Sequence, residues 1–159
     1  EKYGLKLHPE KTRLVRFQRP RLSPKPRAEG SQSGTFCFLG FTHYWGRTRR
    51  GNWAVKRKTA ADRFSRAMVA ITEWCRRNRH RPLGEQGQML SQKLRGHYGY
   101  YGIPGNSAAL RRFRFEVGRT WRKWLCRRSG RARIPWERWN RMMERYALPA
   151  ARIHQPAVA

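Results

Sequence analysis

The sequence predicts an α+β fold that is mainly helical, in which a small sheet precedes a bundle of three or four helices. Aromatic and β-branched residues reach strand density between residues 35 and 57, whereas apolar residues recur at helical spacing from residue 58 onward. Aromatic residues make up 13% of the chain and include seven Trp. A disordered polycation lacks such residues because it builds no core, so we expect a folded protein.

The composition divides the chain into three parts. Residues 1–57 carry the strand signals, residues 58–147 carry the helical signals, and residues 148–159 form a tail with little pattern. Residues 18–34 are rich in Pro, Ser, Gly and charge, which predicts a flexible loop within the first part. A total of 159 residues suits one ordinary domain or two small ones.

Short strands are predicted on both sides of this loop. After it, Thr35 to Trp45 is followed by the turn-like segment GRTRRGN and a return strand from Trp53, so we expect a hairpin. Trp45 and Trp53 flank the hairpin and are expected to pair across its strands. Before the loop, Pro9 separates two strands that are indicated by Leu5, Leu7, Leu14, Val15 and Phe17.

Helix signals follow in order. Thr59 is a suitable N-cap for the first helix and Pro82 ends it. The second helix is expected to fray at the glycines around Tyr100, and Asn106 or Ser107 is expected to cap the third. Pro135 lies in the first turn of the last helix. The residues predicted to face the core are Phe64, Met68, Ile71, Cys75, Leu90, Leu94, Tyr98, Leu110, Phe113, Val117, Trp121, Trp124, Leu125, Trp136, Trp139, Met143 and Tyr146.

The charge of the chain is strongly positive. Lys and Arg together number 37 against nine acids, which gives a net charge of +28 and an isoelectric point near 11.7. Such an imbalance indicates a polyanionic partner. Arg outnumbers Lys by 29 to 8, and because Arg binds phosphate bidentately and stacks on bases, the bias suits RNA. A genome rich in G and C would also favour Arg codons, but it does not account for the charge itself.

Other functional classes are disfavoured. No apolar run approaches the roughly 18 residues of a membrane span, and Cys37, Cys75 and Cys126 form no pair typical of a disulfide framework or a zinc site. We therefore expect no metal ligands, reduced thiols and a cytoplasmic location, as in a bacterial cytoplasm. Asp62 is the only Asp, whereas a two-metal polymerase needs carboxylates held close together.

Several motifs carry a family resemblance. The segment LRGHYGYYGI at 94–103, with EWCRRNRH before it and FRFEVGRTWRKWLCRRS after it, resembles the maturase-specific domain (domain X, the thumb) of group II intron reverse transcriptases. Near the start, GLKLHPEKTRLVRF followed by FCFLGF resembles the last two sequence blocks of the same proteins' reverse-transcriptase palm. The likeness follows the family's order over nearly the whole chain.

The resemblance implies a palm remnant at 1–57 and a thumb at 58–147, taken from a parent protein that copies RNA into DNA and helps intron RNA fold for splicing. The partners that it implies are intron RNA, a template-primer duplex, DNA and the rest of the reverse-transcriptase chain. Magnesium would belong to the family's Tyr-Ala-Asp-Asp turn, which would lie upstream of residue 1, so we expect no cofactor in this chain. On this basis we expect a fragment or a truncated gene product that is not an active polymerase alone.

The resemblance also implies roles for residues of the first part. Lys11 matches a Lys near the incoming nucleotide and would act as a general acid toward the departing pyrophosphate; an ordinary surface Lys is the alternative. Phe38, Leu39, Gly40 and Phe41 match the primer-grip block; a buried strand with a bulge glycine is the alternative.

Candidate RNA-binding residues are cations on presumed outer helix faces, together with the aromatic side chains of the Gly-rich segment. A solvated charged face, or tyrosines that close a core, is the alternative interpretation. The candidates are Lys56, Arg57, Lys58, Arg63, Arg66, Arg95, His97, Tyr100, Tyr101, Arg111, Arg112, Arg114, Arg119, Arg122 and Lys123.

A second function remains open at this point, namely a stand-alone structural RNA-binding protein similar in composition to a ribosomal protein. Such a protein is not expected to carry FCFLGF ahead of its helices. A reading frame that encodes Tyr-Ala-Asp-Asp shortly upstream of residue 1 would favour the intron-encoded protein.

Overall fold

The structure is a computed structural model that describes residues 14–20, 34–129 and 133–154. The chain divides into two compact units, 1–56 and 57–159, and each is described by itself. Four helices and one three-stranded sheet lie within the described residues. The predicted α+β and mainly helical class is therefore confirmed.

The sheet has the order β1-β2-β3, with β1 at Phe36–Phe38, β2 at Phe41–Arg47 and β3 at Trp53–Thr59. The predicted hairpin between β2 and β3 is confirmed, because the amide of Thr48 donates to the carbonyl of Asn52 at 2.8 Å and the chain reverses between them. Gly51 supplies the positive φ, 80°, that this turn requires.

A second, tighter hairpin joins β1 to β2. Phe38 pairs with Phe41, so Leu39 and Gly40 alone form the turn, with φ values of 47° and 78°. Two-residue hairpin loops of this kind need positive φ at both central positions. The alternative of a bulge glycine within a continuous strand is therefore wrong: the backbone reverses at Gly40 because glycine tolerates this conformation.

The segment before the sheet is not a strand. Residues 14–20 adopt no regular secondary structure, so the strand predicted from Leu14, Val15 and Phe17 is wrong. Phe17 nevertheless packs by its ring, edge-on to Phe36 at 4.9 Å and stacked on Trp45 at 5.3 Å between centroids. Its apolar character serves side-chain packing, and the backbone pairs with no strand. The earlier strand residues Leu5 and Leu7, and most of the predicted loop, lie outside the described residues.

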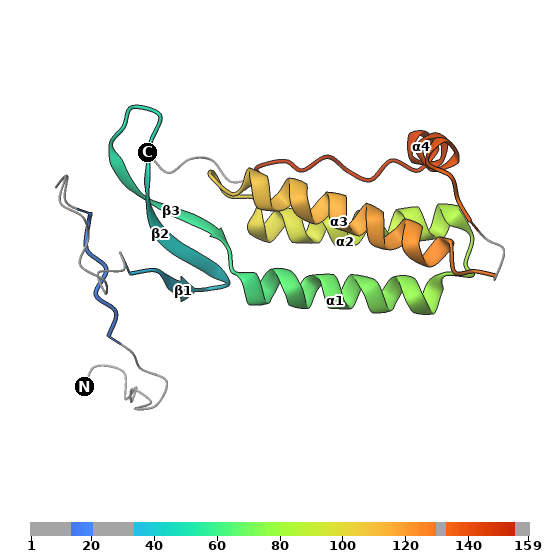
Figure 1. Cartoon of the computed structure of the whole chain (residues 1–159), viewed down its shortest axis with the longest axis horizontal. Coiled ribbons are helices and arrows are strands. Elements are labelled where there is room, and N and C mark those ends of the chain that lie inside the picture. Colours follow the sequence, from blue (N-terminus) through green and yellow to red (C-terminus); the bar gives the residue numbers. More distant parts are fainter. Residues whose placement is uncertain (1–13, 21–33, 130–132, 155–159) are drawn as a thin grey trace. The chain divides into compact units, whose positions relative to one another are not determined.

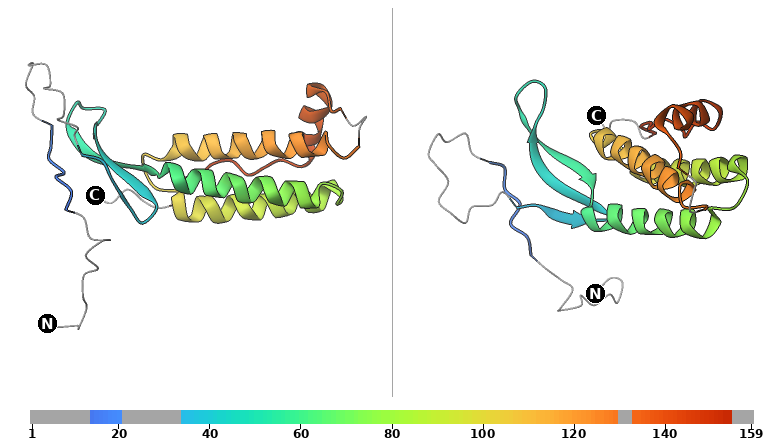
Figure 2. Two further views of the ribbon diagram at one scale, coloured as in Figure 1. Left: turned by 60° about the horizontal axis from the view of Figure 1, so that its bottom comes forward. Right: turned by 45° about the vertical axis from the view of Figure 1, so that its right-hand side comes forward.

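In the second unit, helices α1 (Ala61–Asn78), α2 (Leu83–Tyr101) and α3 (Ser107–Leu125) run side by side (Figures 1 and 2). Helix α4 (Trp136–Arg145) lies at the end where α3 finishes. Most residues predicted to face the core do so. The buried apolar residues of this helical unit are Ala60, Ile71, Cys75, Leu90, Leu94, Tyr98, Ile103, Leu110, Phe113, Val117, Trp121, Leu125, Trp139 and Leu148.

Trp136 departs from the predicted core stripe of α4. Its side chain is 59% exposed, whereas Trp139 is 7% exposed and packs edge-on against Trp121 at 5.7 Å. Trp136 is the first residue of α4 and follows the N-cap Pro135. Helical spacing predicts that Trp136 lies on the apolar face of α4, but the part of this face that reaches the core begins at Trp139.

The chain after α4 packs along the helices, which the sequence pattern did not indicate. The carbonyl of Leu148 accepts from the Arg114 guanidinium at 3.1 Å, and that of Pro149 accepts from the Tyr98 hydroxyl at 3.2 Å. The amide of His154 then donates to the carbonyl of Gly102 at 2.9 Å. This segment, drawn in orange-red, returns from α4 toward the turn between α2 and α3 (Figure 1).

Two buried amide side chains hold the ends of the helical unit. At one end, Asn106 donates to the Thr59 hydroxyl at 2.8 Å and to the Tyr101 carbonyl at 2.9 Å, and it accepts from the Thr59 amide at 3.0 Å. The predicted N-cap role of Thr59 is therefore wrong: Ala60 occupies that position, and the Thr59 side chain bonds to Asn106. Asn106 is itself the N-cap of α3, but it makes no side-chain cap bond there.

At the other end, Gln86 accepts from the Trp121 indole at 2.8 Å and donates to the carbonyl of Arg81 at 2.7 Å. It also donates to the carbonyl of Arg79, at 3.3 Å. These carbonyls follow α1 and lack helical partners. The Arg128 guanidinium donates to the same two carbonyls, so Gln86 shares them with Arg128 while it also holds the buried Trp121 indole.

The glycines of α2 do not fray it. The helix continues through Gly96 and Gly99 to Tyr101 and ends at Gly102. A Cβ on Gly96 or Gly99 would meet nothing within 4 Å, whereas a Cβ on Gly102 would lie 2.3 Å from the Tyr98 carbonyl oxygen. Of these three glycines, only Gly102 leaves no room for a Cβ, because the Tyr98 carbonyl oxygen and the returning backbone at Arg152 and His154 surround it.

No helix among the described residues combines the length and the apolar character that a bilayer span requires.

Candidate nucleic-acid interface

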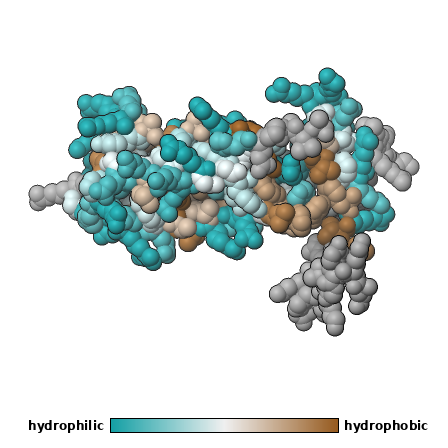
Figure 3. Space-filling view, turned by 180° about the vertical axis from the view of Figure 1, so that it is seen from behind, coloured by the Kyte–Doolittle hydropathy of each residue, from teal (hydrophilic) through white to brown (hydrophobic). Residues whose placement is uncertain are grey.

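The helical unit exposes far more positive than negative charge. Its described residues form three ion pairs, Arg63–Asp62, Arg77–Glu73 and Arg119–Glu116, at 3.2–3.5 Å. The arginine of each pair is exposed, so the pairs contribute little to stability. With so few carboxylates, most guanidinium groups of the described residues have no acidic partner. Over the helical region, at the left of Figure 3, hydrophilic residues cover most of the visible face.

One group of candidate residues meets where α1 begins and α2 ends. Arg63 and Arg66 lie on α1, and Tyr100 and Tyr101 form the last turn of α2; we call these four residues the α1–α2 patch. Burial raises the pKa of Tyr101, as do the neighbouring Tyr100 and Asp62, while the charges of Arg63 and Arg66 lower it. The two helices therefore bring cations and phenol rings together, although 34 residues or more separate them in sequence.

The two tyrosines differ in exposure. Tyr100 is 51% exposed, and its ring meets the half-buried Tyr101 ring edge-on, with 4.8 Å between centroids. Tyr98 is fully buried in the core, as predicted. Tyr100 is thus the ring of this segment that is most open to a ligand.

His97 lies behind the patch. Its ring stacks on Phe113, with 3.8 Å between centroids, and contacts the Tyr101 ring at a tilt, with 4.5 Å between centroids; burial lowers the pKa of His97 to about 4. The imidazole is therefore neutral near pH 7 and offers no charge to phosphate. The structure places this predicted RNA contact as a packing residue that supports Tyr101.

Arg111 and Arg112 extend the positive surface onto α3, where both are exposed. The Arg112 guanidinium lies over the Phe64 ring of α1, 5.2 Å from its centroid. Phe64 in turn packs edge-on against Phe113 at 5.7 Å. A cation that is held on an aromatic ring keeps its outer side available to phosphate.

Arg114 is engaged differently. Both its Nε and its Nη2 donate to the Leu148 carbonyl, at 3.2 and 3.1 Å. It fixes the chain that returns after α4. We therefore assign it a structural contact in place of a contact with RNA.

The C-terminal half of α3 carries a second group of candidates. Arg119, Arg122 and Lys123 line a hollow of about 680 Å³ together with Arg133 and Trp136. Arg122 donates to the Ile134 carbonyl at 2.7 Å, and its guanidinium lies 3.7 Å from the centroid of the Trp136 ring. This group lies at the opposite end of α3 from Arg111 and Arg112.

The remaining cationic candidates lie elsewhere. Arg95 lines a hollow of about 570 Å³ beside Arg145 and Tyr146, away from the patch residues. Arg57 and Lys58 are exposed on β3, and Lys56 is half-buried beside Gly46. The structure thus divides among several surfaces the cations that the sequence analysis had grouped together.

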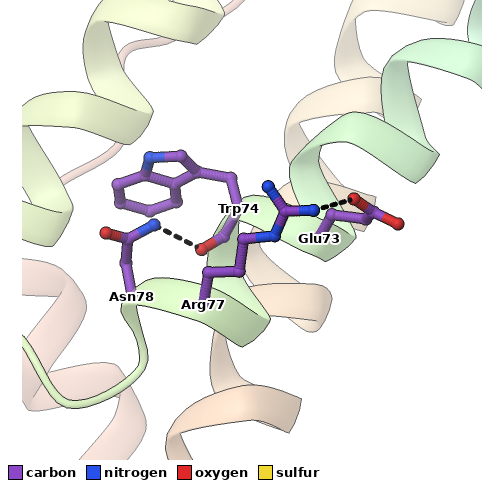
Figure 4. Close-up of polar contacts among 4 residues, drawn as sticks. All are labelled: Glu73, Trp74, Arg77 and Asn78. Atoms are coloured by element: carbon purple, nitrogen blue, oxygen red, sulfur yellow. Dashed lines mark hydrogen bonds and ion pairs between the residues drawn. The ribbon is translucent and has the colours of Figure 1, made fainter.

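The far end of α1 differs from the patch. There Arg77 is paired with Glu73 at 3.2 Å, and Asn78 donates to the Trp74 carbonyl at 2.8 Å (Figure 4). The Lys93 ammonium lies over the Trp74 ring at 5.8 Å. Here the aromatic ring is half-buried, whereas Tyr100 of the patch is exposed; Arg77, like Arg63, has a carboxylate partner.

The candidates of the first unit can be placed in part. Lys11 lies outside the described residues. In the primer-grip block, Phe38 and Leu39 are 58% and 66% exposed at the tip of the hairpin, while Phe41 is 9% exposed. The block therefore forms an apolar tip whose backbone is held in a tight turn.

The described residues contain no group of three or more His, Cys, Asp or Glu side chains that could hold a metal ion. Asp62, the only Asp of the chain, is exposed and paired with Arg63 at 3.5 Å. A two-metal centre of the kind that polymerases use does not fit these residues.

Sequence reasoning missed Trp136 as a surface residue, as well as the two buried amides. The signal for Trp136 was its place directly after Pro135, because a first-turn residue lies at the margin of the face that a helix buries. Nothing in the sequence marks Gln86, and Asn106 was expected only as a helix cap, since their buried partners are 35 and 47 residues away.

Comparisons with protein-family models, with curated proteins and with solved structures found no match.

Proposed function

We propose that this chain is the RNA-gripping C-terminal portion of a group II intron reverse transcriptase and maturase. Its role is to hold template-primer and intron RNA for reverse transcription and splicing. The observation that carries the proposal is the α1–α2 patch, where two exposed arginines and an exposed tyrosine ring meet beside a single acid. Support for the family comes from the motif order described above.

The patch suits binding and positioning. Arg63 and Arg66 supply forked donors for phosphate oxygens, and such contacts fix the register of a nucleic acid with little dependence on its sequence. Tyr100 offers a ring edge or face to an unpaired base or a ribose at the same place. The chemical step would belong to carboxylates and magnesium elsewhere in the parent protein, because the one Asp here is paired with Arg63.

In this proposal the β1–β2 hairpin is the primer grip. Gly40, at φ 78°, keeps the turn free of a side chain on that side, so the backbone can approach a nucleic acid closely. Phe38 and Leu39 would lie against sugar rings, for which exposed apolar side chains are suitable.

The test is a charge-matched pair of double variants on α1. Arg63→Ala with Arg66→Ala removes two charges from the patch, and Arg76→Ala with Arg77→Ala removes two charges from the last turn of the same helix. If the patch grips RNA, the first variant lowers the slope of log affinity against log salt by about one unit for each lost phosphate contact. The second variant changes that slope much less, because it leaves the patch intact. It is a matched control, since each variant removes one arginine that has a carboxylate partner, Asp62 for Arg63 and Glu73 for Arg77.

Binding is measured by fluorescence anisotropy on a labelled RNA duplex, with thermal melts to verify that both variants fold. Equal losses in the two variants would show that RNA binds the net charge of the chain without preferring the patch. That outcome would contradict the proposal.

A further inference from the structure

Trp136 is a large aromatic side chain on the surface of a folded helical unit. It is 59% exposed, although indole is among the side chains that contribute most when they are buried. The core does not need it, since Trp139 and Trp121 fill the contact between α4 and α3. Its position therefore needs another explanation.

Arg122 holds the indole in place from one side. The guanidinium lies 3.7 Å from the ring centroid and is itself fixed by its hydrogen bond to the Ile134 carbonyl at 2.7 Å. One face of the ring is thus covered by a fixed cation, while more than half of the side chain stays exposed. This arrangement preorganises the other face for a flat ligand.

Two hollows meet at this ring, and together we call them the α3–α4 groove. The larger, of about 680 Å³, is lined by the cations Arg119, Arg122, Lys123 and Arg133 and by a single acid, Glu116. The smaller, of about 260 Å³, shares Arg119 and Trp136 with the first and adds the 63%-exposed Phe115. The groove therefore combines an excess of positive charge with two exposed aromatic rings.

We infer that the α3–α4 groove binds an unpaired stretch of RNA, with one base stacked on Trp136 and the flanking phosphates held by Arg119, Lys123 and Arg133. The inference rests on the proposed RNA-binding function and adds a second site with a different preference. Single-stranded nucleic acids are held by grooves in which cations follow the backbone and aromatic rings stack on bases. The groove has both elements.

Unpaired RNA fits this groove better than a duplex or an acidic peptide does. A duplex keeps its bases stacked inside, so it would gain nothing from an exposed indole. An acidic peptide would match the charge, but it offers no flat group to the ring that Arg122 presents. The combination of an exposed ring that Arg122 holds in place with further cations lining the same hollow favours a nucleotide.

The test compares an oligouridylate of about ten nucleotides, a length that one single-strand-binding groove covers, with an RNA duplex of similar length. In the full chain, Trp136→Ala is expected to weaken oligouridylate binding by about 5- to 150-fold, which corresponds to the loss of one stacked base. Duplex binding is expected to stay within about twofold. Trp136→Phe retains a ring and should restore much of the affinity, and Val69→Ala, at an exposed apolar site on α1, should change neither.

A second measurement needs no variant. Ultraviolet crosslinking of oligouridylate to the unmodified chain should attach it to the peptide that contains Trp136. Attachment only to peptides of the α1–α2 patch would overturn the inference, as would an unchanged oligouridylate affinity in a folded Trp136→Ala protein. Equal dependence on Trp136 for an oligoglutamate peptide would overturn it in favour of a peptide site.

These outcomes are separable from a failure of the proposed function. If the groove inference alone fails, duplex binding and its dependence on Arg63 and Arg66 persist. If the proposed function fails, duplex binding is either absent at low salt or equally sensitive to the two double variants of α1.

Discussion

The two ends of the helical unit are each held by a buried side-chain amide, but they differ in which ring and which cation are packed. Where α1 begins, the buried Asn106 amide joins Thr59 to Tyr101. Where α1 finishes, the buried Gln86 amide joins Trp121 to the carbonyl of Arg81. Asn106 thus ties the start of α1 to the end of α2 beside the α1–α2 patch, and Gln86 ties the end of α1 to α3.

The surfaces themselves are inverted. In the α1–α2 patch the Tyr101 ring is packed on His97 and the arginines face outward. In the α3–α4 groove the Arg122 guanidinium is packed and the Trp136 ring faces outward. Both surfaces expose cations that suit phosphates, but only in the groove is the exposed ring held by a packed cation, an arrangement that suits an unpaired base. We therefore expect the two ends to bind different parts of one RNA.

The largest effect should come from the core that both ends share. Trp121→Ala is expected to lower the free energy of unfolding by about 3–5 kcal/mol, because it leaves a cavity and removes the indole partner of Gln86. Trp136→Ala should change it by no more than about 0.5 kcal/mol, since its side chain is largely exposed. Denaturant unfolding of the full chain measures both, and similar losses would mean that Trp136 belongs to the core.

The two amides provide the next test. Asn106→Ala and Gln86→Ala should each cost about 1–3 kcal/mol for every buried group that loses its partner. The exposed Asn140→Ala and Gln88→Ala serve as controls and should be nearly neutral. At matched folded fraction, Asn106→Ala should weaken duplex binding more than Gln86→Ala does. The reverse order would break the assignment of the duplex to the α1–α2 patch.

The burial of His97 behind the α1–α2 patch predicts that the stability of the folded protein depends on pH. The pKa of His97 is lowered to about 4 in the folded protein from an ordinary value of 6.5, so between these values the unfolded chain binds the additional proton. Stability should be full above about pH 6.5 and should fall as the pH decreases toward 4, by at most about 1.4 kcal/mol per unit. In His97→Phe this slope should flatten, as followed by denaturant unfolding at several pH values. An unchanged slope would place the imidazole in solvent.

Alanine substitutions at the glycines in and directly after α2 should change the free energy of unfolding by smaller amounts, in opposite directions at different positions. Gly96→Ala and Gly99→Ala should each raise the free energy of unfolding by about 0.5–1 kcal/mol, because open space surrounds both positions and alanine favours helix. Gly102→Ala should destabilise, since its Cβ would contact the Tyr98 carbonyl and the chain that returns after α4. Thermal melts of the three variants check the signs. Destabilisation by Gly96→Ala would indicate a partner on that face of α2.

The helices were predictable because their apolar spacing is regular. Leu90, Leu94 and Tyr98 face the core as their spacing requires. The strand predicted around Leu14 failed because Phe17 packs by its ring without backbone pairing. The turn at Leu39–Gly40 was missed because the aromatic density of its flanks concealed a reversal that depends on two positive φ values.

For the candidate site, the sequence predicted the kind of partner from the composition, but not which residues share a surface. The excess of Arg indicated a polyanion, and Arg63 is exposed as expected, while Tyr100, for which core packing was the open alternative, is 51% exposed. Which cations share a surface depends on how α1, α2 and α3 pack, so Arg95 and Arg114 were grouped with residues that lie elsewhere. The groove at Trp136 depends on where α4 begins relative to α3, which periodicity does not determine.

The most direct test of the account is the salt dependence of RNA binding by the full chain. If cations at both ends grip phosphates, the release of counterions from about six to ten phosphates should lower the affinity by about 10³–10⁵ between about 50 and 200 mM salt. An affinity that stays nearly constant over this range, or no RNA binding at the lowest salt, would contradict the claim that this helical unit is an electrostatic grip for RNA.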